Sequence, residues 1–101
     1  AEAISAMKPS GIFVNVARGD VVDERALISS LKRNAIAGAG LDVYEAEPFV
    51  PEELRQLENA VLLPHLGTAA LEVREELGLM ALQNLIAWDE GRDLPNRVHA
   101  D

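Results

Sequence analysis

The sequence contains no cysteine and few aromatic residues, which excludes cysteine-based sites and a core built from aromatic side chains. Without cysteine the chain has no disulfide, no thiolate metal ligand and no cysteine nucleophile. This is typical of a reducing compartment, and we expect a cytoplasmic protein. Aromatic residues make up only 4% of the chain, so aliphatic side chains must fill its core. The two histidines lie too far apart in the sequence to suggest a metal site, and we expect none.

Basic residues and long apolar runs are also scarce. The chain has 9 basic and 17 acidic residues and a net charge of −8, so neither nucleic acid nor an acidic membrane surface is an expected partner. No apolar run approaches the roughly 20 residues that a membrane-spanning helix needs, and the first residues do not resemble a signal peptide. The apolar fraction of 49% is typical of a folded globular domain.

Three short apolar runs alternate with helical patterns along the chain. Residues 12–16 are apolar on both faces apart from Asn15, which suits a central strand of a parallel sheet. Residues 37–43 are rich in glycine and alanine, which would let a neighbouring segment approach closely, and residues 60–63 form a third, shorter run. Strands that alternate with helices predict an α/β domain with a parallel sheet.

The helices between these runs have recognisable start and stop signals. Asp23 is a good N-cap for a helix of about three turns, and Asn34 is a suitable residue to end it. Pro51 is expected near the start of a short helical turn.

A longer helix is predicted over residues 69–90. Thr68 is the expected cap at its start and Gly91 the expected stop. Its apolar side chains recur at helical spacing and predict one apolar face, made of Val73, Leu77, Met80, Ala81, Asn84, Leu85 and Trp88.

The ends of the three predicted strands carry ionisable side chains. Arg18, Asp42 and His65 each fall at a carboxyl end, which is where ligands bind in open parallel sheets. Arg18 suits bidentate recognition of a carboxylate, although a turn arginine is more often a solvated charge. His65 suits acid–base chemistry near neutral pH, although structural histidines are common. Asp42 suits a ligand amide, or is an ordinary turn aspartate that caps the next segment.

A carboxylate close to His65 would favour the catalytic interpretation, because it would orient the ring and favour its protonated form. The preceding loop offers Glu45, Glu47 and Glu58. Pro48 restricts Glu47 to an extended conformation and so defines its direction better. Spacing alone does not choose among the three glutamates.

Three ordered motifs, residues 15–27, 40–48 and 63–69, resemble the arginine, aspartate–glutamate and histidine signatures of the NAD(P)-dependent D-2-hydroxyacid dehydrogenases. The resemblance runs from about residue 3 to residue 98. It implies a three-layer, Rossmann-like parallel sheet of which about three strands with flanking helices are present. It also implies an oxidoreductase that uses NAD or NADP on a small 2-keto or 2-hydroxy acid. Residues 47–54 are similar to the glyoxylate and hydroxypyruvate reductase branch.

The resemblance also implies a role for each residue that matches a motif. Arg18 would bind the substrate carboxylate and keto oxygen, and His65 would protonate the carbonyl. Glu47 would hold His65 protonated, and Asp42 would bind the nicotinamide carboxamide. The implied cofactor-binding set is Val16, Ala17, Arg18, Asp42, His65 and Gly67.

The sequence departs from the family in having no Gly-x-Gly-x-x-Gly stretch. We therefore interpret residues 1–101 as the C-terminal half of a dinucleotide-binding domain, with residues 92–101 as an exit linker, and expect it to be inactive alone. Two alternatives stay open at this point: a dinucleotide-sensing binding module, and a half-domain that associates with itself, for example as a homodimer.

Overall fold

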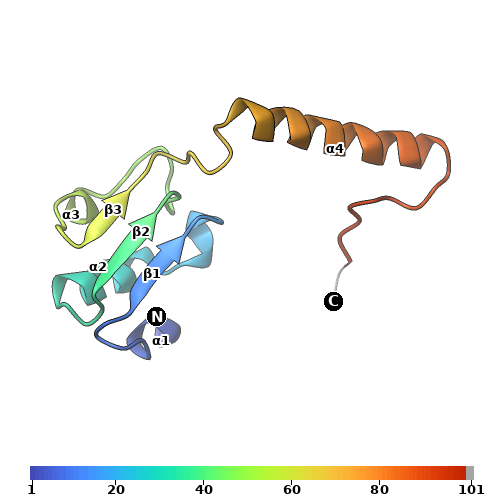
Figure 1. Ribbon diagram of the computed structural model, residues 1–101. Coiled ribbons are helices and arrows are strands. Elements are labelled where there is room, and N and C mark those ends of the chain that lie inside the picture. The colour runs from blue at the N-terminus through green and yellow to red at the C-terminus, as the bar shows by residue number, and fades with distance from the viewer. Residues whose placement is uncertain (100–101) are drawn as a thin grey trace. The chain divides into compact units, whose positions relative to one another are not determined.

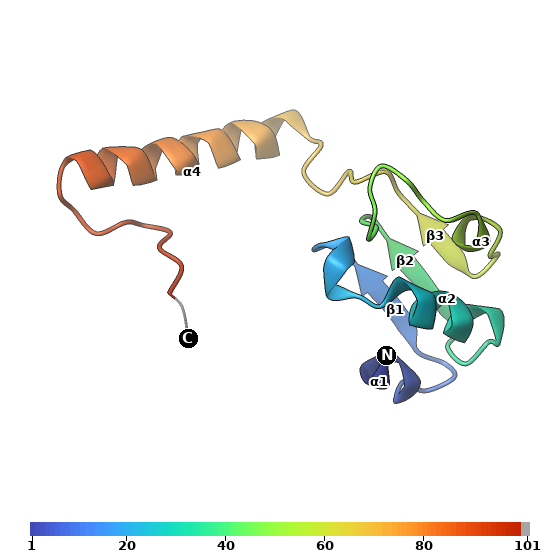
Figure 2. The same ribbon diagram turned by 180° about the vertical axis from the view of Figure 1, so that it is seen from behind.

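A computed structural model describes residues 1–99, which divide into two compact units, Ala1–Gly67 and the segment from Thr68 onward. Figures 1 and 2 show the elements of both. In the first unit they are α1 (Glu2–Ser5), β1 (Ile12–Asn15), the 3₁₀ helix η1 (Gly19–Val21), α2 (Glu24–Lys32), β2 (Gly38–Leu41), α3 (Glu52–Arg55) and β3 (Ala60–Leu62). The second unit holds α4 (Leu71–Asp89).

The three strands form one parallel sheet in the order β1-β2-β3. Val14 on β1 is paired with Gly40 on β2, and Gly40 with Val61 on β3. The predicted α/β fold with a parallel sheet and flanking helices is confirmed. Each strand is one to three residues shorter than its apolar run, mostly at the carboxyl end, where the chain turns away to build the site described below.

The core of the first unit lies between the sheet and α2, which stands in front of the sheet in Figure 2. Leu27 and Leu31 project from α2 and are almost fully buried, each stabilising the fold by about 1.5–3 kcal/mol. The expected N-cap is confirmed, since Asp23 accepts a hydrogen bond of 2.9 Å from the Ala26 amide. Asn34 has a φ of 51°, the left-handed conformation that ends a helix, as predicted.

The opposite face of the sheet carries apolar side chains that are open to solvent. Ile12, Val14 and Val61 are 68%, 65% and 66% exposed, and Gly38 and Gly40 lie between them. No helix of residues 1–67 covers this face, which is turned toward the viewer in Figure 1. The close approach expected at the glycine-rich strand is found at Gly38, where an added Cβ atom would lie 2.9 Å from the carbonyl oxygen of Asn59.

The second unit corrects the predicted start of the long helix. The helix begins at Leu71 after Ala70, and no side chain caps it, so Thr68 as cap was wrong. Thr68 lies three residues before the first helical residue, and its carbonyl instead accepts a hydrogen bond of 3.4 Å from Arg74 Nε. The predicted stop is confirmed, because Gly91 has a φ of 66°.

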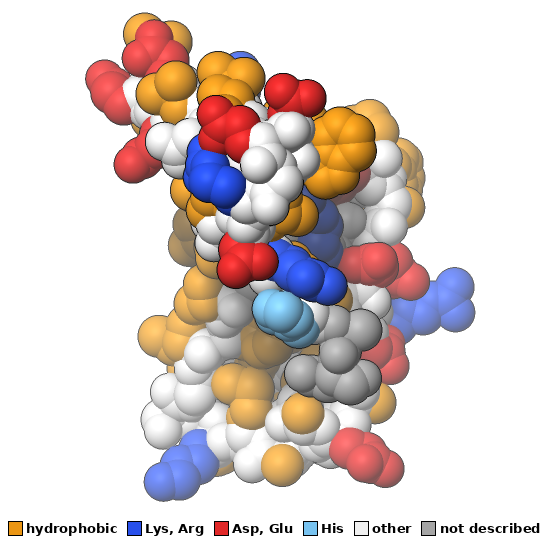
Figure 3. Space-filling view, turned by 90° about the vertical axis from the view of Figure 1, so that its right-hand side faces the viewer, with side chains coloured by type: hydrophobic (Ala, Val, Ile, Leu, Met, Phe, Trp, Pro, Cys, Tyr) orange, Lys and Arg blue, Asp and Glu red, His pale blue; other side chains and the backbone are white. Residues whose placement is uncertain are grey.

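Apolar side chains are exposed on several sides of α4, so the predicted apolar face does not stand apart from the rest of the helix. The exposed set includes both predicted and additional positions: Leu71, Leu77, Leu79, Met80, Leu82, Leu85, Ile86 and Trp88. Figure 3 shows hydrophobic side chains among charged ones on one face of the molecule. No helix among residues 1–99 has the length and apolar content that crossing a membrane requires.

Beyond α4, residues 92–99 contain no helix or strand. The last two residues of the predicted linker, 100 and 101, lie outside the described part of the chain. The interpretation of residues 92–101 as an exit linker stays a prediction.

Candidate active site

The carboxyl end of the sheet brings Glu47 and His65 together. Glu47 lies in the connection between β2 and α3, and His65 follows β3. His65 Nδ1 is 2.7 Å from Glu47 Oε2, so the loop folds to place this glutamate, rather than Glu45 or Glu58, beside the ring. With Nδ1 engaged, Nε2 of the half-exposed ring is the nitrogen left to meet a ligand.

The charge state of Glu47 reflects this pairing. The hydrogen bond with His65 is the largest cause that lowers the pKa of the Glu47 carboxyl below its ordinary value, and the hydrogen bond from the Tyr44 amide is the next. Desolvation by burial is the third cause in size and opposes them by raising the pKa, and the charges of His65 and Arg18 lower it by smaller amounts. The pKa of Glu47 is therefore lowered chiefly by its two hydrogen-bond partners, with smaller contributions from the charges of the two basic side chains.

Tyr44 supports the pair from behind and was not singled out by the sequence. Its amide donates to Glu47 Oε1 at 3.0 Å, and its buried hydroxyl donates to the carbonyl oxygen of Leu63 at 2.8 Å. Burial is the main cause that raises the pKa of this hydroxyl. The ring thus ties the segment after β2 to the segment that leads into His65. The sequence signal that could have drawn attention to Tyr44 was its position directly after the predicted strand, as the single tyrosine of the chain.

Asp42 is buried at the end of β2 and faces the backbone after His65. Its Oδ1 accepts a hydrogen bond from the Leu66 amide and its Oδ2 one from the Gly67 amide, both at 2.7 Å. Its own amide donates to the carbonyl oxygen of Asn15 at 3.0 Å, across to β1. These hydrogen bonds tie the end of β2 to the turn after His65, and the binding of a ligand amide by Asp42 stays a prediction.

Arg18 lies in the exposed turn after β1, which the buried Asn15 side chain shapes. Asn15 Nδ2 donates to the Arg18 carbonyl oxygen at 2.8 Å, and Asn15 Oδ1 accepts from the Ala17 amide at 3.1 Å. Gly19 then passes so close to the backbone of Tyr44 that an added Cβ atom would lie 1.9 Å from the Tyr44 carbonyl carbon. Asn15 and Gly19 thus shape the turn that carries Arg18, which residue type alone did not reveal.

The remaining predicted cofactor residues lie at the same end of the sheet. Val16 and Ala17 are exposed directly after β1, and Gly67 is exposed two residues after His65. A cavity of about 390 Å³ borders the Glu47–His65 pair and is lined by Tyr44, Glu47, Pro48, Val50, Pro64 and His65. The described residues contain no cluster of three side chains that could hold a metal ion.

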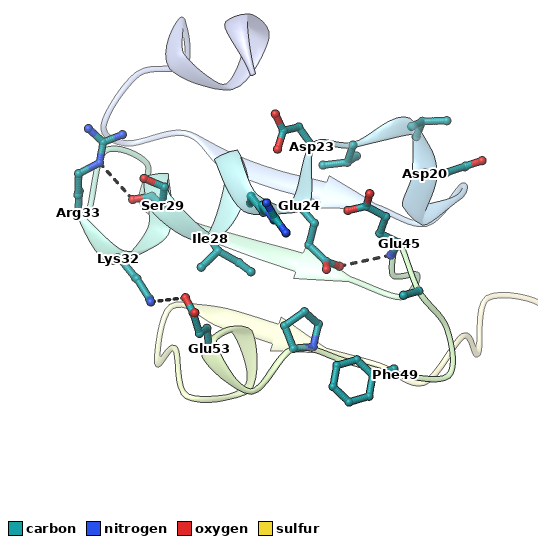
Figure 4. A pocket seen from close by; sticks show the side chains of 15 residues that line it. Asp20, Asp23, Glu24, Ile28, Ser29, Lys32, Arg33, Glu45, Phe49 and Glu53 are labelled. Carbon is teal, nitrogen blue, oxygen red and sulfur yellow. Dashed lines mark hydrogen bonds and ion pairs between the residues drawn. The ribbon is translucent and has the colours of Figure 1, made fainter.

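A larger cleft of about 1430 Å³ runs along α2 and contains none of the predicted site residues. Figure 4 shows the polar contacts that line it. Lys32 pairs with Glu53, and Glu24 accepts a hydrogen bond of 3.4 Å from the Glu45 amide. The first contact joins α2 to α3, and the second joins α2 to the loop that carries Glu47.

The arrangement combines an exposed cation, an imidazole that can give or take a proton, and a carboxylate that orients the imidazole. A cation of this kind binds the carboxylate of a small acid, while the imidazole serves a carbonyl or hydroxyl oxygen beside it. The site is therefore suited to proton transfer on a small carboxylic acid.

Comparison with known proteins identifies the family of the chain. Residues 1–67 match the family described as D-isomer specific 2-hydroxyacid dehydrogenase, NAD binding domain. The match confirms the resemblance inferred from the three motifs, and with it the expected nicotinamide cofactor class, NAD or NADP.

Individual relatives agree with the family. Over 100 residues the chain is 50% identical to a glyoxylate reductase of Pyrococcus furiosus. This alignment covers 99% of this chain and 30% of that protein. It is 46% identical over 93 residues to a hydroxyphenylpyruvate reductase of Plectranthus scutellarioides, covering 92% of this chain and 30% of the relative. The chain thus spans under a third of the length of these relatives.

A solved structure also superposes well on this chain. It is an NADPH-dependent glyoxylate/hydroxypyruvate reductase of Sinorhizobium meliloti in complex with NADP and malonate. The TM-score is 0.84 at 42% sequence identity, covering 96% of this chain and 30% of that one.

Proposed function

We propose that this chain, which belongs to the family of D-isomer specific 2-hydroxyacid dehydrogenases, forms part of an enzyme that reduces a small 2-keto acid with NAD(P)H. The observation that carries the proposal is the 2.7 Å contact between His65 and Glu47, at the sheet end that also carries Arg18. Relatives named as glyoxylate reductases support glyoxylate or hydroxypyruvate as substrate. Alone, the chain is proposed to be inactive.

Arg18 binds and orients the substrate in this proposal. Its guanidinium is exposed and close enough to Glu47 to lower the pKa of that carboxyl. A planar guanidinium forms paired hydrogen bonds with a carboxylate, so it holds the acid group of the substrate and leaves the neighbouring carbonyl beside His65.

His65 transfers the proton. The contact of Nδ1 with Glu47 fixes the ring plane and leaves Nε2 to donate a proton to the substrate carbonyl oxygen. The bound cofactor supplies the hydride that the carbonyl carbon accepts. In the oxidative direction Nε2 takes the proton back from the hydroxyl oxygen, and the Glu47 carboxylate stabilises the positive charge that the ring then carries.

The residues at the sheet end fit the nicotinamide part of the cofactor. Val16 and Ala17 leave small apolar side chains exposed at the carboxyl end of β1, and Gly67 is exposed two residues after His65. Such a surface accepts a flat ring without steric conflict. Val16, Ala17 and Gly67 are thus the residues that would hold the nicotinamide, which would supply the hydride.

The location and assembly of the protein are further proposals. The absence of cysteine supports a cytoplasmic location. The exposed apolar face of the sheet, made of Ile12, Val14 and Val61, supports self-association of the chain when it is studied alone.

A chimeric enzyme tests the proposed activity. The chain would replace the 100 aligned residues of the Pyrococcus furiosus glyoxylate reductase, to which it is 50% identical. We expect this chimera to oxidise NADH or NADPH in the presence of glyoxylate or hydroxypyruvate, and the chain alone to do neither. A folded chimera that binds the dinucleotide but reduces no 2-keto acid would favour a dinucleotide-sensing module instead.

A further inference from the structure

The backbone at His65 adopts a conformation that requires support. Its φ is 54°, in the left-handed region that residues with a side chain seldom adopt. Such conformations persist where the surroundings determine them. The Glu47 contact reaches only the ring of His65, so it holds the side chain and not the backbone.

The support for this backbone comes from Asp42. The two residues that follow His65 direct their amides at the two oxygens of one carboxylate, Leu66 at Oδ1 and Gly67 at Oδ2, each at 2.7 Å. Hydrogen bonds from amides to an ionised carboxylate are shorter and stronger than those between neutral groups. Asp42 is only 3% exposed, so water competes little for these bonds.

Gly67 permits this arrangement by the space that it leaves. A Cβ atom at this position would lie 3.0 Å from Asp42 Oδ2, so a side chain would press on the carboxylate that its own amide binds. The absence of a side chain at Gly67 therefore allows the turn to lie against Asp42.

We infer that Asp42 is a positioning residue for His65: its carboxylate sets the turn that aims the imidazole at Glu47 and at the substrate. The orientation of the imidazole toward a substrate rests on the proposed function, whereas the hydrogen bonds of Asp42 to the turn do not. It assigns Asp42 an effect on turnover that direct binding of the cofactor would not produce.

Nuclear magnetic resonance on the 101-residue chain tests the geometry without any activity. We expect scalar couplings across the hydrogen bonds from the amide nitrogens of Leu66 and Gly67 to the carboxyl carbon of Asp42. Couplings absent from both amides in the folded chain would overturn the inference, whatever the variants do.

The Asp42→Asn variant tests the consequence for the pair. A side-chain amide offers one acceptor oxygen in place of two, so one of the two amides loses its partner. We expect the titration of the Glu47 carboxyl to move toward its ordinary value, because the ring of His65 is no longer held against it. Asp89→Asn, which removes the same charge from an exposed position on α4, should leave that titration unchanged. An unchanged Glu47 titration in folded Asp42→Asn would contradict the inference.

Kinetics of the chimera separate positioning from cofactor binding. We expect Asp42→Asn to lower kcat on the order of 100-fold, because misplacing a catalytic group by about 1 Å costs that much, while KM for NAD(P)H changes little. A raised KM for the dinucleotide with kcat unchanged would overturn the inference in favour of direct cofactor binding. An inactive parent chimera would refute the proposed function, and the two resonance experiments would still decide the role of Asp42.

Discussion

Replacing Gly19 by alanine should disrupt both the fold and the site. The added Cβ atom would lie 1.9 Å from the carbonyl carbon of Tyr44 and 2.0 Å from its oxygen, where ordinary contact begins at 3.4 Å. The two backbone segments would have to separate by about 1.5 Å, which is 3.4 minus 1.9. Both neighbours are backbone, so no flexible side chain can give way.

The loss of unfolding free energy caused by this separation can be compared with known values. Overpacking a well-packed position costs about 1–3 kcal/mol and occasionally more, and backbone on both sides puts Gly19→Ala at the upper end. A loss of about 3 kcal/mol is a large share of the roughly 5–15 kcal/mol that stabilises a domain. For a domain of this size it lowers Tm by about 12–24 °C.

Thermal and urea unfolding followed by circular dichroism measure the effect, with Gly40→Ala as the matched control in the same sheet. At Gly40 the nearest atom to an added Cβ is Val14 Cγ2 at 3.9 Å, an ordinary contact, so this variant should unfold close to the parent chain. If Gly19→Ala unfolded at the same temperature as Gly40→Ala, the close approach of the Arg18 turn to Tyr44 would be refuted.

Three further outcomes follow from the structure. His65→Ala should raise the pKa of Glu47 toward its ordinary value of 4.5, because the largest cause of its lowering is removed. Since the pKa of Glu47 is lowered in the folded chain, the pair stabilises the fold above pH 4.5, and this stabilisation is lost as the pH falls through the lower pKa of the folded chain. The pKa of Glu47 is measured from its carboxyl resonance as a function of pH. An unchanged pKa in His65→Ala would contradict the pairing. Leu31→Ala should cost about 2–5 kcal/mol in urea unfolding, because the side chain is buried against the sheet, and a loss under 1 kcal/mol would place it outside the core. The chain alone should self-associate through its exposed apolar sheet face, and a monomeric mass by light scattering at all concentrations would speak against this.

Much of the fold follows from local signals. The apolar runs are short, bounded by turn residues and separated by one capped helix, and a parallel sheet is the arrangement that buries them. Asp23, Asn34 and Gly91 were predictable because capping depends on a few neighbouring residues. Thr68 was not, because the actual start of α4 at Leu71 has no side-chain cap to signal it.

The sequence predicts which residues lie at the strand ends, but not which groups they form hydrogen bonds with. That Arg18, Asp42 and His65 gather at one edge follows from parallel topology alone. Which glutamate meets His65 depends on the path of a loop, and spacing does not encode that path. The partners of Asp42 are backbone amides 24 and 25 residues later, and backbone amides leave no mark on the sequence.

In the proposed mechanism His65, held by Glu47, transfers the proton to a 2-keto acid. The most direct test is kcat of the chimera with glyoxylate as His65 is replaced by alanine, with the exposed Asp89→Asn as control. We expect a loss of about 10²–10⁴-fold for His65→Ala and none for the control. A His65→Ala enzyme that retained the parent kcat would contradict it.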